Sequence, residues 1–220
     1  MTEITFRSDC RVTYIDSMGD DKRIAQAARV STGSDQSDRP HEGLVKRLWR
    51  DQHTSTFEHN TLTVMVEVPI FVAREWHRHR TQAFNEVSGR YTEMEPVFYV
   101  PGEDRPLVQT GKAMDYRREA GSPILRAVTD RFMRIAGKGA WRLYEYLLRK
   151  GVAREVARNV LPVSLYTRFY ATANLRNWLA FIKLRTDPTA LWEIREAARQ
   201  VAGLIQEKWP TAWAAYEETL

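Results

Sequence analysis

Three segments of the chain alternate apolar and polar residues and predict strands. Residues 61–68 place Leu or Val at every second position, residues 165–172 repeat the pattern with Leu165, Phe169 and Ala171 on one side, and residues 11–15 alternate over a shorter run. Successive side chains of a strand point to opposite faces, so a period of two indicates a strand with one buried face. The segment 61–68 is the clearest of the three.

Most of the remaining chain places apolar residues three or four positions apart, which predicts amphipathic helices. Pro69 fits the first turn of one helix, Asn174 is a helix-capping residue, Gly151 suits a helix C-terminus, and Pro210 should end the last helix. The predicted helices cover residues 21–30, 42–50, 70–80, 124–150, 153–160, 175–184 and 188–209. The predicted inward face of 124–150 is Leu125, Val128, Phe132, Ile135, Leu143 and Leu147.

Polar segments between these elements predict loops at 32–41 and 81–91, and a loop or partly helical excursion at 101–123. Few strands and many helices in mixed order indicate the α+β class, with helices packed on a mixed or antiparallel sheet. A length of 220 residues with 43% hydrophobic residues suits one domain over residues 1–220.

Composition and charge limit the cellular compartment in which we expect the protein and the kinds of ligand that it could bind. No run of 18 or more apolar residues exists, so we expect no membrane span. Cys10 is the single cysteine, so we expect no internal disulfide. Because the first six residues also lack the pattern of a signal peptide, we expect a cytoplasmic protein. The formal charge is +5, and 26 of the 33 basic residues are Arg. Arginine binds phosphate through a planar fork, although genomic base composition explains the same excess equally well.

Segment 74–91 concentrates the candidate chemistry. Arg78 and Arg80 lie two positions apart, which on a helix separates them by about 200°. Either the helix ends between them or they serve different ligands. Basic residues near a helix C-terminus also have a purely structural explanation, because they favour the negative end of the helix dipole. The following Ser88-Gly89-Arg90 combines backbone N–H groups, a hydroxyl and a guanidinium, a set that suits phosphate.

Arg78-His79-Arg80, seven intervening residues and then Ser88 resemble the signature of flavin-dependent thymidylate synthases. Further stretches resemble that family in the same order over roughly residues 25–210, whereas 101–123 carries no resemblance. These stretches are His53 with Phe57-Glu58-His59, residues 69–74, residues 154–158 running into Leu161-Pro162, residues 166–169, and Arg185.

The resemblance implies an enzyme that converts dUMP to dTMP. Methylenetetrahydrofolate would supply the carbon, reduced FAD the hydride, and NADPH would reduce the flavin. It also implies a homotetramer with active sites shared between subunits, so Arg78 and Arg80 would serve ligands held by different chains.

The resemblance assigns roles residue by residue. The cofactor-binding positions would be Ser55, Arg78, His79, Arg80, Glu86, Asn174 and Arg176. The substrate-binding positions would be Glu75, Trp76, His77, Arg78, Glu86, Val87, Ser88, Gly89, Arg90, Arg158 and Arg185. Arg185 and Ser88 would be catalytic, with Arg185 favouring ionisation at N3 of the uracil ring, since a fixed cation stabilises a developing anion.

Two positions depart from the family pattern. Glu75 stands where Gln is frequent and would repel a phosphate, and Ala180 stands where a polar flavin contact is frequent. Ser55 replaces a frequent Thr and keeps the hydroxyl.

Other readings of the same residues are weaker. Cys10 has no nearby His in sequence, so an incidental role is favoured over a nucleophile, and no metal site is expected, because His77 and His79 would point to opposite sides of a helix. Of six aromatic residues that could stack on a ligand, we expect about two-thirds in the core; they are Trp141, Tyr144, Tyr146, Tyr166, Phe169 and Tyr170. The alternative function is a nucleic-acid-binding module that uses the Arg-rich helix, but basic and acidic residues are interleaved along the chain, as on a solvated surface.

Overall fold

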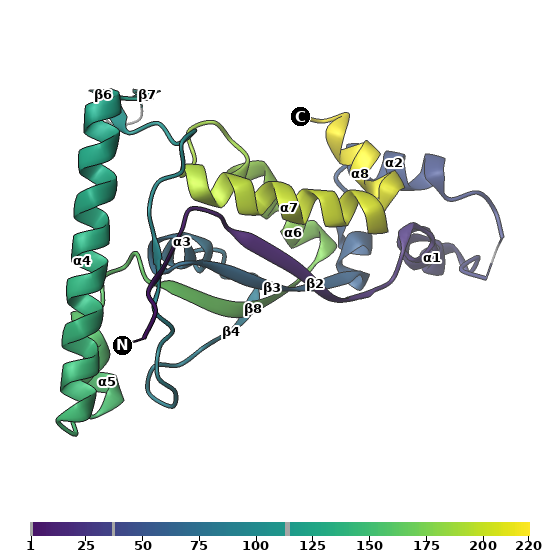
Figure 1. Cartoon of the computed structure of the whole chain (residues 1–220). Helices are drawn as coiled ribbons and strands as arrows, with labels where there is room; N and C mark the ends of the chain where they lie inside the picture. The colour runs from purple at the N-terminus through teal and green to yellow at the C-terminus, as the bar shows by residue number, and fades with distance from the viewer. Residues whose placement is uncertain (1, 37, 113–114) are drawn as a thin grey trace. The chain divides into compact units, whose positions relative to one another are not determined.

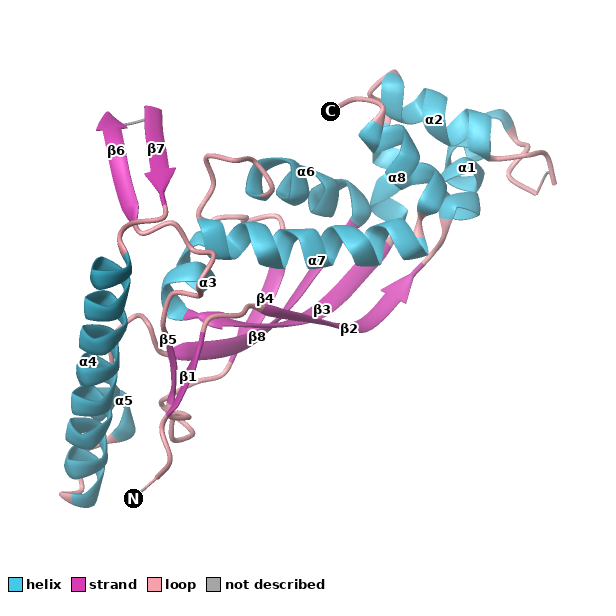
Figure 2. Ribbon diagram, turned by 45° about the horizontal axis from the view of Figure 1, so that its top comes forward, coloured by secondary structure: helices cyan, strands magenta, loops and turns pink. Residues whose placement is uncertain are grey.

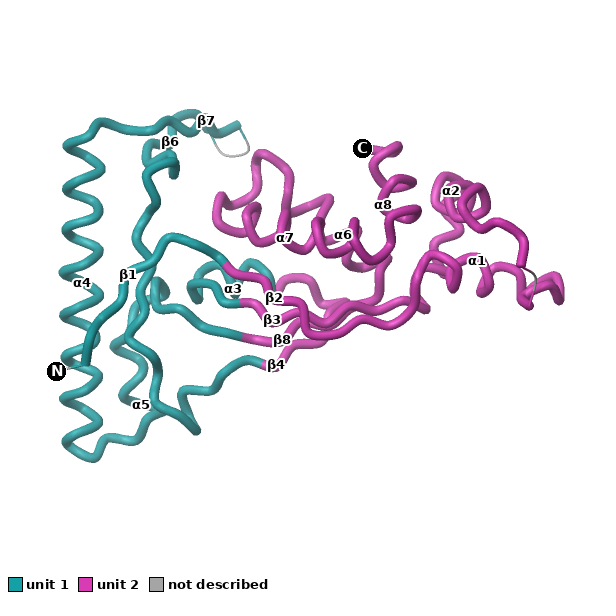
Figure 3. Tube along the Cα trace, turned by 45° about the vertical axis from the view of Figure 1, so that its right-hand side comes forward, with its two compact units in different colours: residues 1–10, 67–76, 86–168 teal, residues 11–66, 77–85, 169–220 magenta. Residues whose placement is uncertain are grey.

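The computed structural model describes residues 2–36, 38–112 and 115–220 (Figure 1). The chain divides into two compact units that interleave along the sequence (Figure 3). Unit 1 comprises residues 1–10, 67–76 and 86–168, and unit 2 comprises residues 11–66, 77–85 and 169–220. Neither unit is therefore a continuous segment of sequence.

A four-stranded sheet has the order β2-β3-β8-β4. Its strands are β2 (Arg11–Met18), β3 (Thr61–Pro69), β8 (Tyr166–Asn174) and β4 (Ala83–Glu86). The alternation that predicted β3 is confirmed, because Leu62, Val64, Val66 and Val68 are all fully buried. β4 falls in the segment predicted to be a loop, and β2 extends three residues beyond its prediction.

Two smaller sheets were not predicted. Strands β1 (Thr5–Arg7) and β5 (Val97–Tyr99) pair in parallel, and β6 (Val108–Lys112) pairs antiparallel with β7 (Asp115–Glu119). The prediction of a loop or partly helical excursion at 101–123 is therefore wrong for residues 108–112 and 115–119, and residues 113 and 114 lie outside the described residues. Gly111 in β6 has a φ of +93°, and a Cβ there would clash with the Asp115 carbonyl oxygen, so glycine allows the close approach of β7. The two strands pair through their backbones, and their polar side chains give no alternating pattern that predicts a strand.

Unit 2 contains most of the helices, and α6 and α7 lie side by side over one face of its part of the sheet (Figures 1 and 2). Its elements are α1 (Asp21–Arg29), η1 (Val30–Thr32), α2 (Glu42–Arg50), η2 (Thr54–His59), α6 (Leu175–Arg185), α7 (Trp192–Lys208) and α8 (Pro210–Glu217). Asn174 caps α6 as predicted, because its side-chain oxygen accepts from Asn177 N at 2.9 Å.

Of the two predicted boundaries of the last long helix in unit 2, the start is wrong and the end is confirmed. The last long helix begins at Trp192 and not at Pro188, since Asp187 accepts from the backbone and hydroxyl of Thr189 and forms a separate turn. The end of that helix is confirmed, because α7 stops at Lys208, just before Pro210, but Pro210 also opens an unpredicted helix, α8, where its missing N–H removes no helical bond.

Unit 1 holds α3 (Ile70–Trp76), α4 (Pro123–Arg149), α5 (Arg154–Ala157) and η3 (Arg158–Val160). α4 packs its Trp141 and Tyr144 against Phe98 of β5 and Leu165. Gly137 allows this approach, since a Cβ there would lie 3.2 Å from ring atoms of Phe6 and Phe98. Gly151 ends α4 in the left-handed conformation with φ of +79°, which confirms its predicted role.

The predicted inward face of α4 is largely wrong. Leu125, Val128, Phe132, Ile135 and Leu143 are exposed, with Phe132 at 63%. The helix instead buries the side that carries Gly137, Trp141 and Tyr144. Apolar periodicity shows which side of a helix is apolar, but it does not show whether another part of the same chain packs on that side.

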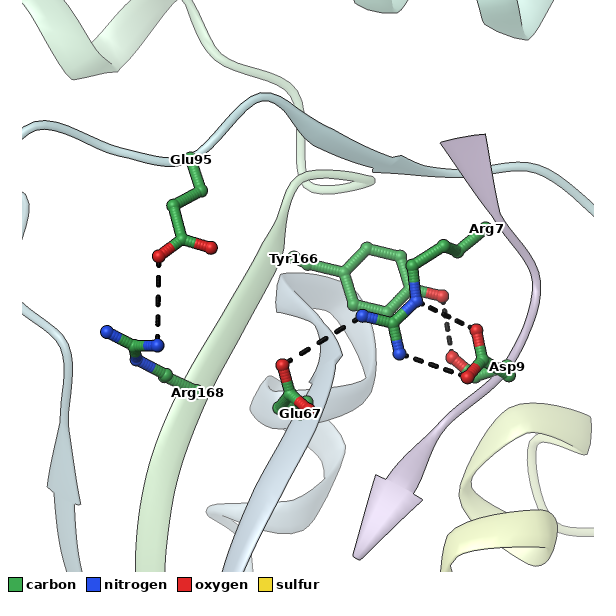
Figure 4. Close-up of polar contacts among 6 residues, drawn as sticks. All are labelled: Arg7, Asp9, Glu67, Glu95, Tyr166 and Arg168. Atoms are coloured by element: carbon green, nitrogen blue, oxygen red, sulfur yellow. Dashed lines mark hydrogen bonds and ion pairs between the residues drawn. The ribbon is translucent and has the colours of Figure 1, made fainter. Parts of the chain in front are cut away.

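A polar cluster in unit 1 ties β1 to β3 and β8 (Figure 4). Arg7 donates to both carboxylate oxygens of Asp9 at 2.8 and 3.0 Å and lies 3.9 Å from Glu67. Its guanidinium also stacks over the Tyr166 ring, whose hydroxyl donates to the Asp9 carbonyl at 2.6 Å. The Asp9 contact raises the pKa of Arg7. The bonds from Arg7 to Asp9 are charge-assisted, and the Tyr166 ring and hydroxyl bring β8 to the same cluster.

The α+β prediction is confirmed. Throughout the described ranges, every helix is too short or too polar to span a lipid bilayer.

Candidate functional site

A cavity of about 320 Å³ in unit 1 gathers several of the predicted site residues. We call it the anion pocket. Its lining residues are Ile70, Glu86, Val87, Ser88, Gly89, Arg90, Met94, Arg158, Leu161, Leu165 and Thr167. The structure therefore brings Arg158 to the 86–90 segment, although 68 positions (158 − 90) separate it from Arg90 in sequence.

The Ser88-Gly89-Arg90 segment is a tight turn. The Ser88 carbonyl accepts from Tyr91 N at 3.0 Å and Thr92 N at 3.1 Å, and the Ser88 hydroxyl lies 3.3 Å from Arg90 N. A Cβ on Gly89 would come within 2.9 Å of the Met94 sulfur and 3.0 Å of Arg158 Cδ. Glycine is thus the residue that allows Arg158 to approach the turn.

The two arginines of the anion pocket differ in their partners. Arg90 Nε donates to Glu155 at 3.1 Å, and both side chains are more than half exposed. Arg158 has no ion-pair partner among the described residues. Glu86 accepts from the Thr167 hydroxyl at 2.6 Å, which fixes the carboxylate at the wall. The anion pocket thus has one guanidinium in an ion pair and one without an ion-pair partner among the described residues, and the second guanidinium favours an anionic ligand.

The Arg78-His79-Arg80 segment is not helical, because α3 ends at Trp76. The prediction of a helix to residue 80 is wrong, and so is the premise of a 200° separation. The His77 ring packs on Phe84 and Phe169 with centroids 4.6 and 4.8 Å away, which draws the chain back toward β4. Arg78 and Arg80 are exposed and have no ion-pair partner within the described ranges.

His79 joins the segment to the end of α6. Its Nε2 accepts a hydrogen bond from Arg185 Nε at 2.7 Å, and its ring meets Phe181 edge-on at 4.8 Å. Two predicted site residues that are 106 positions apart are therefore in direct contact.

A second cavity, of about 760 Å³, lies in unit 2. We call it the polar cavity. Its lining residues are Ala27, Ala28, Ser31, Leu44, Arg47, Leu48, Asp51, Gln52, His53, Thr54, Ser55, Thr56 and Arg176. Ser55 and Arg176, both predicted at the flavin, share this wall, and Arg176 forms an ion pair with Glu58. The hydrogen bond from Arg50 lowers the pKa of the Asp51 carboxyl, so Asp51 is an anion at this wall at neutral pH.

Three other predicted positions line neither cavity, and neither does Ala180, which departs from the family pattern. Trp76 is fully buried, so its ring contributes to the core. Asn174 uses its side-chain oxygen as the cap of α6, Glu75 is half-buried, and Ala180 is exposed on α6.

Several lining residues were not predicted. Thr167 lies within a stretch that resembles the family, so that resemblance was the available signal, whereas nothing in the sequence links Glu155 to Arg90. Of the aromatic residues considered for stacking, Trp141, Tyr144, Tyr166 and Phe169 are buried and Tyr146 and Tyr170 are exposed, which confirms the expected two-thirds. Cys10 is buried. The described residues contain no cluster of His, Cys, Asp or Glu that could hold a metal ion.

Comparisons with known proteins agree on one family. The family model described as thymidylate synthase complementing protein matches residues 13–211. A flavin-dependent thymidylate synthase of Thermus thermophilus is 44% identical over 95% of this chain and 76% of its own length, and one of Streptomyces avermitilis is 42% identical over 96% and 88%. The crystal structure of PolB, a UMP/dUMP methylase of Streptomyces cacaoi bound with 5-Br UMP, superposes with a TM-score of 0.92 at 40% identity, covering 98% of this chain and 96% of PolB.

Proposed function

Because this chain belongs to the thymidylate synthase complementing protein family, whose curated relatives are named flavin-dependent thymidylate synthases, we propose that it methylates dUMP to dTMP. The carbon comes from methylenetetrahydrofolate, and NADPH is the reductant. FAD, when bound and reduced, supplies the hydride. The enzyme is a methyltransferase of dTMP biosynthesis.

The anion pocket is the observation that carries this proposal. It offers the Ser88 turn and two guanidiniums, an arrangement that suits the phosphate of dUMP. Glu86 and Val87 line the same wall and would contact the rest of the nucleotide. The solved complexes of PolB with 5-Br UMP and 5-Br dUMP support a pyrimidine nucleotide as the ligand class.

The polar cavity suits FAD by its size and donors. About 760 Å³ lies in the range of small-molecule and cofactor pockets, and hydroxyl and guanidinium groups on its wall match a ligand with two phosphates. Ser55 and Arg176 would hold the cofactor there. We propose Arg78, His79, Arg80, Glu86 and Asn174 as its further contacts, with the two unpaired arginines offering charge to the phosphates.

Arg185 would act on the uracil ring. A guanidinium held beside N3 stabilises the negative charge that forms when the ring ionises. We also assign Glu75, Trp76 and His77 to the nucleotide side of the site, with Trp76 acting through the packing of its neighbours because its ring is buried. Ser88 would position the substrate, since no histidine or carboxylate is hydrogen-bonded to its hydroxyl in the described part of the chain.

We propose that the enzyme is a homotetramer with shared active sites. The exposed face of α4 supports an assembly, because Ile124, Val128, Phe132, Ile135 and Leu143 are apolar residues exposed at helical spacing, and exposed apolar patches mark protein interfaces. We further propose a single functional domain over residues 1–220 and a cytoplasmic location. The comparisons give no support to the nucleic-acid-binding alternative.

The test is a reconstitution assay. The purified full chain should take up FAD, turn yellow, and convert dUMP to dTMP only when methylenetetrahydrofolate and NADPH are both present. Omission of either co-substrate is the control. A protein that binds no FAD, or that methylates nothing in the complete mixture, would contradict the proposal. Salt-sensitive binding to DNA or RNA would favour the alternative.

A further inference from the structure

The bond between Arg185 and His79 fixes the state of the histidine. A guanidinium has donors only, so His79 Nε2, 2.7 Å from Arg185 Nε, must be the acceptor. The ring is therefore neutral and carries its proton on Nδ1. A doubly protonated ring could not accept this bond and would place a second cation against the guanidinium.

Packing holds the same ring in place. His79 meets Phe181 edge-on, with centroids 4.8 Å apart and planes at 71°. Phe181 is fully buried, and it precedes Arg185 by four residues, which is one helical turn on the same face of α6. One face of α6 thus presents a rigid aromatic surface and a long flexible cation, and His79 contacts both.

We propose that His79 is a positioning residue for Arg185. The Nε2 acceptor holds the guanidinium in one orientation, so that its charge lies at a fixed place when the uracil ring ionises. This inference rests on the proposed function for the role of Arg185, and it assigns His79 a task in addition to its flavin contact. Without the acceptor, Arg185 keeps its charge but loses its fixed direction, which reduces the stabilisation of the reacting ring.

Two variants of His79 distinguish the effect of its hydrogen-bond acceptor from the effect of its packing. His79→Gln keeps an acceptor near the place of Nε2, whereas His79→Leu keeps apolar packing on Phe181 and has none. We expect His79→Leu to lower kcat by about tenfold or more with KM for dUMP changed by less than about threefold, and His79→Gln to restore most of the loss. Equal losses in the two variants would overturn the proposal. FAD content measured by absorbance is the control for cofactor binding.

A double-mutant cycle tests whether His79 acts through Arg185. In an Arg185→Ala background, His79→Leu should cause little further loss of kcat, because the partner that it positions is absent. Independent, multiplying losses would show that His79 acts elsewhere, for example on the flavin alone, and would overturn the proposal.

A spectroscopic measurement is independent of activity. Nitrogen NMR of the full chain labelled in histidine, with and without FAD, should give His79 an unprotonated Nε2 and a protonated Nδ1 at pH 7.5. The opposite tautomer or a doubly protonated ring would overturn the positioning role. If wild-type protein has the expected tautomer but methylates no dUMP, the proposed function fails while the His79–Arg185 bond stands.

Discussion

At the scale of single residues, the partners of each arginine decide what it can do for a ligand. Arg90 already bonds to Glu155, whereas Arg158 has no ion-pair partner in the described ranges. An anion that binds Arg158 therefore meets no competing carboxylate among the described residues, while one that binds Arg90 competes with Glu155. The sequence predicts the same role, nucleotide binding, for Arg90 and Arg158, but the two side chains differ in their electrostatic environment.

Arg158→Ala should weaken dUMP binding by about 10- to 100-fold, the loss expected for a charge-assisted hydrogen bond. The dissociation constant of FAD should change little. Calorimetric titration with each ligand measures both, and Arg199→Ala is the matched control, since Arg199 is an exposed arginine paired to Glu196 on α7. An unchanged dUMP affinity would exclude Arg158 from the phosphate site.

Gln52 is the one non-glycine residue with positive φ in the described part of the chain, at +60°. It ends α2 in a Schellman arrangement, because His53 N donates to Leu48 O at 2.8 Å and Gln52 N to Trp49 O at 3.1 Å. Glycine is the residue that this position prefers, since it adopts the left-handed conformation without a Cβ clash.

Gln52→Gly should accordingly raise the free energy of unfolding by about 0.5 kcal/mol or more. Gln52→Ala is the matched control, because it removes the side-chain bond to Trp49 O but retains the strain. Denaturant titration of both variants measures the difference. If the glycine variant is less stable than the alanine variant, backbone strain at residue 52 is not significant.

At the scale of elements, one carboxylate connects two helices that are far apart in sequence. Asp21 begins α1, and its oxygens accept from Thr211 N at 2.8 Å and Ala212 N at 3.0 Å in the first turn of α8. A buried anion at a helix N-terminus satisfies backbone donors and complements the helix dipole. The sequence gives no sign of this contact.

Asp21→Ala should lower stability by about 1–2 kcal/mol, the usual loss of an N-terminal cap. For a chain of this size, that shifts the melting temperature by about 2–8 °C. Asp38→Ala is the control, because the Asp38 side chain is 97% exposed and forms an ion pair with Lys22 at 3.8 Å. A drop no larger than that of the control would show that α8 is capped in another way.

At the scale of the whole molecule, the exposed face of α4 carries apolar residues that this chain leaves uncovered. Its apolar periodicity is real, yet Ile124 and Phe132 are 77% and 63% exposed. Apolar side chains that repeat along one helix without a cover in their own chain favour an assembly of chains.

Phe132→Asp should therefore reduce the mass of the particle measured by light scattering, because a charge on this face opposes burial against another chain. If active sites are shared between subunits, activity should fall together with the mass. Val30→Asp, at a solitary exposed valine in unit 2, is the control. A variant that keeps the wild-type mass would remove α4 from the interface.

The sequence by itself determined the features that depend on neighbouring residues. Alternation in β3, the Asn174 cap and the Gly151 terminus follow from local periodicity and local hydrogen bonding, and the structure confirms them. The motif from Arg78 to Ser88 was enough to indicate the family, because residue identities at fixed spacing do not depend on knowing the fold.

Only the tertiary structure decided the features that depend on distant residues. α3 ends at Trp76, and His77 then packs on Phe169. β6 pairs with β7 through backbone groups although both strands are polar. Arg158 reaches the Ser88 turn because Gly89 leaves room for it. The contact of His79 with Arg185 joins residues 106 positions apart. The local sequence determines the chemistry that a side chain offers and the secondary structure that it favours. The partners of that side chain depend on packing between segments that are distant in sequence, so only the tertiary structure shows them.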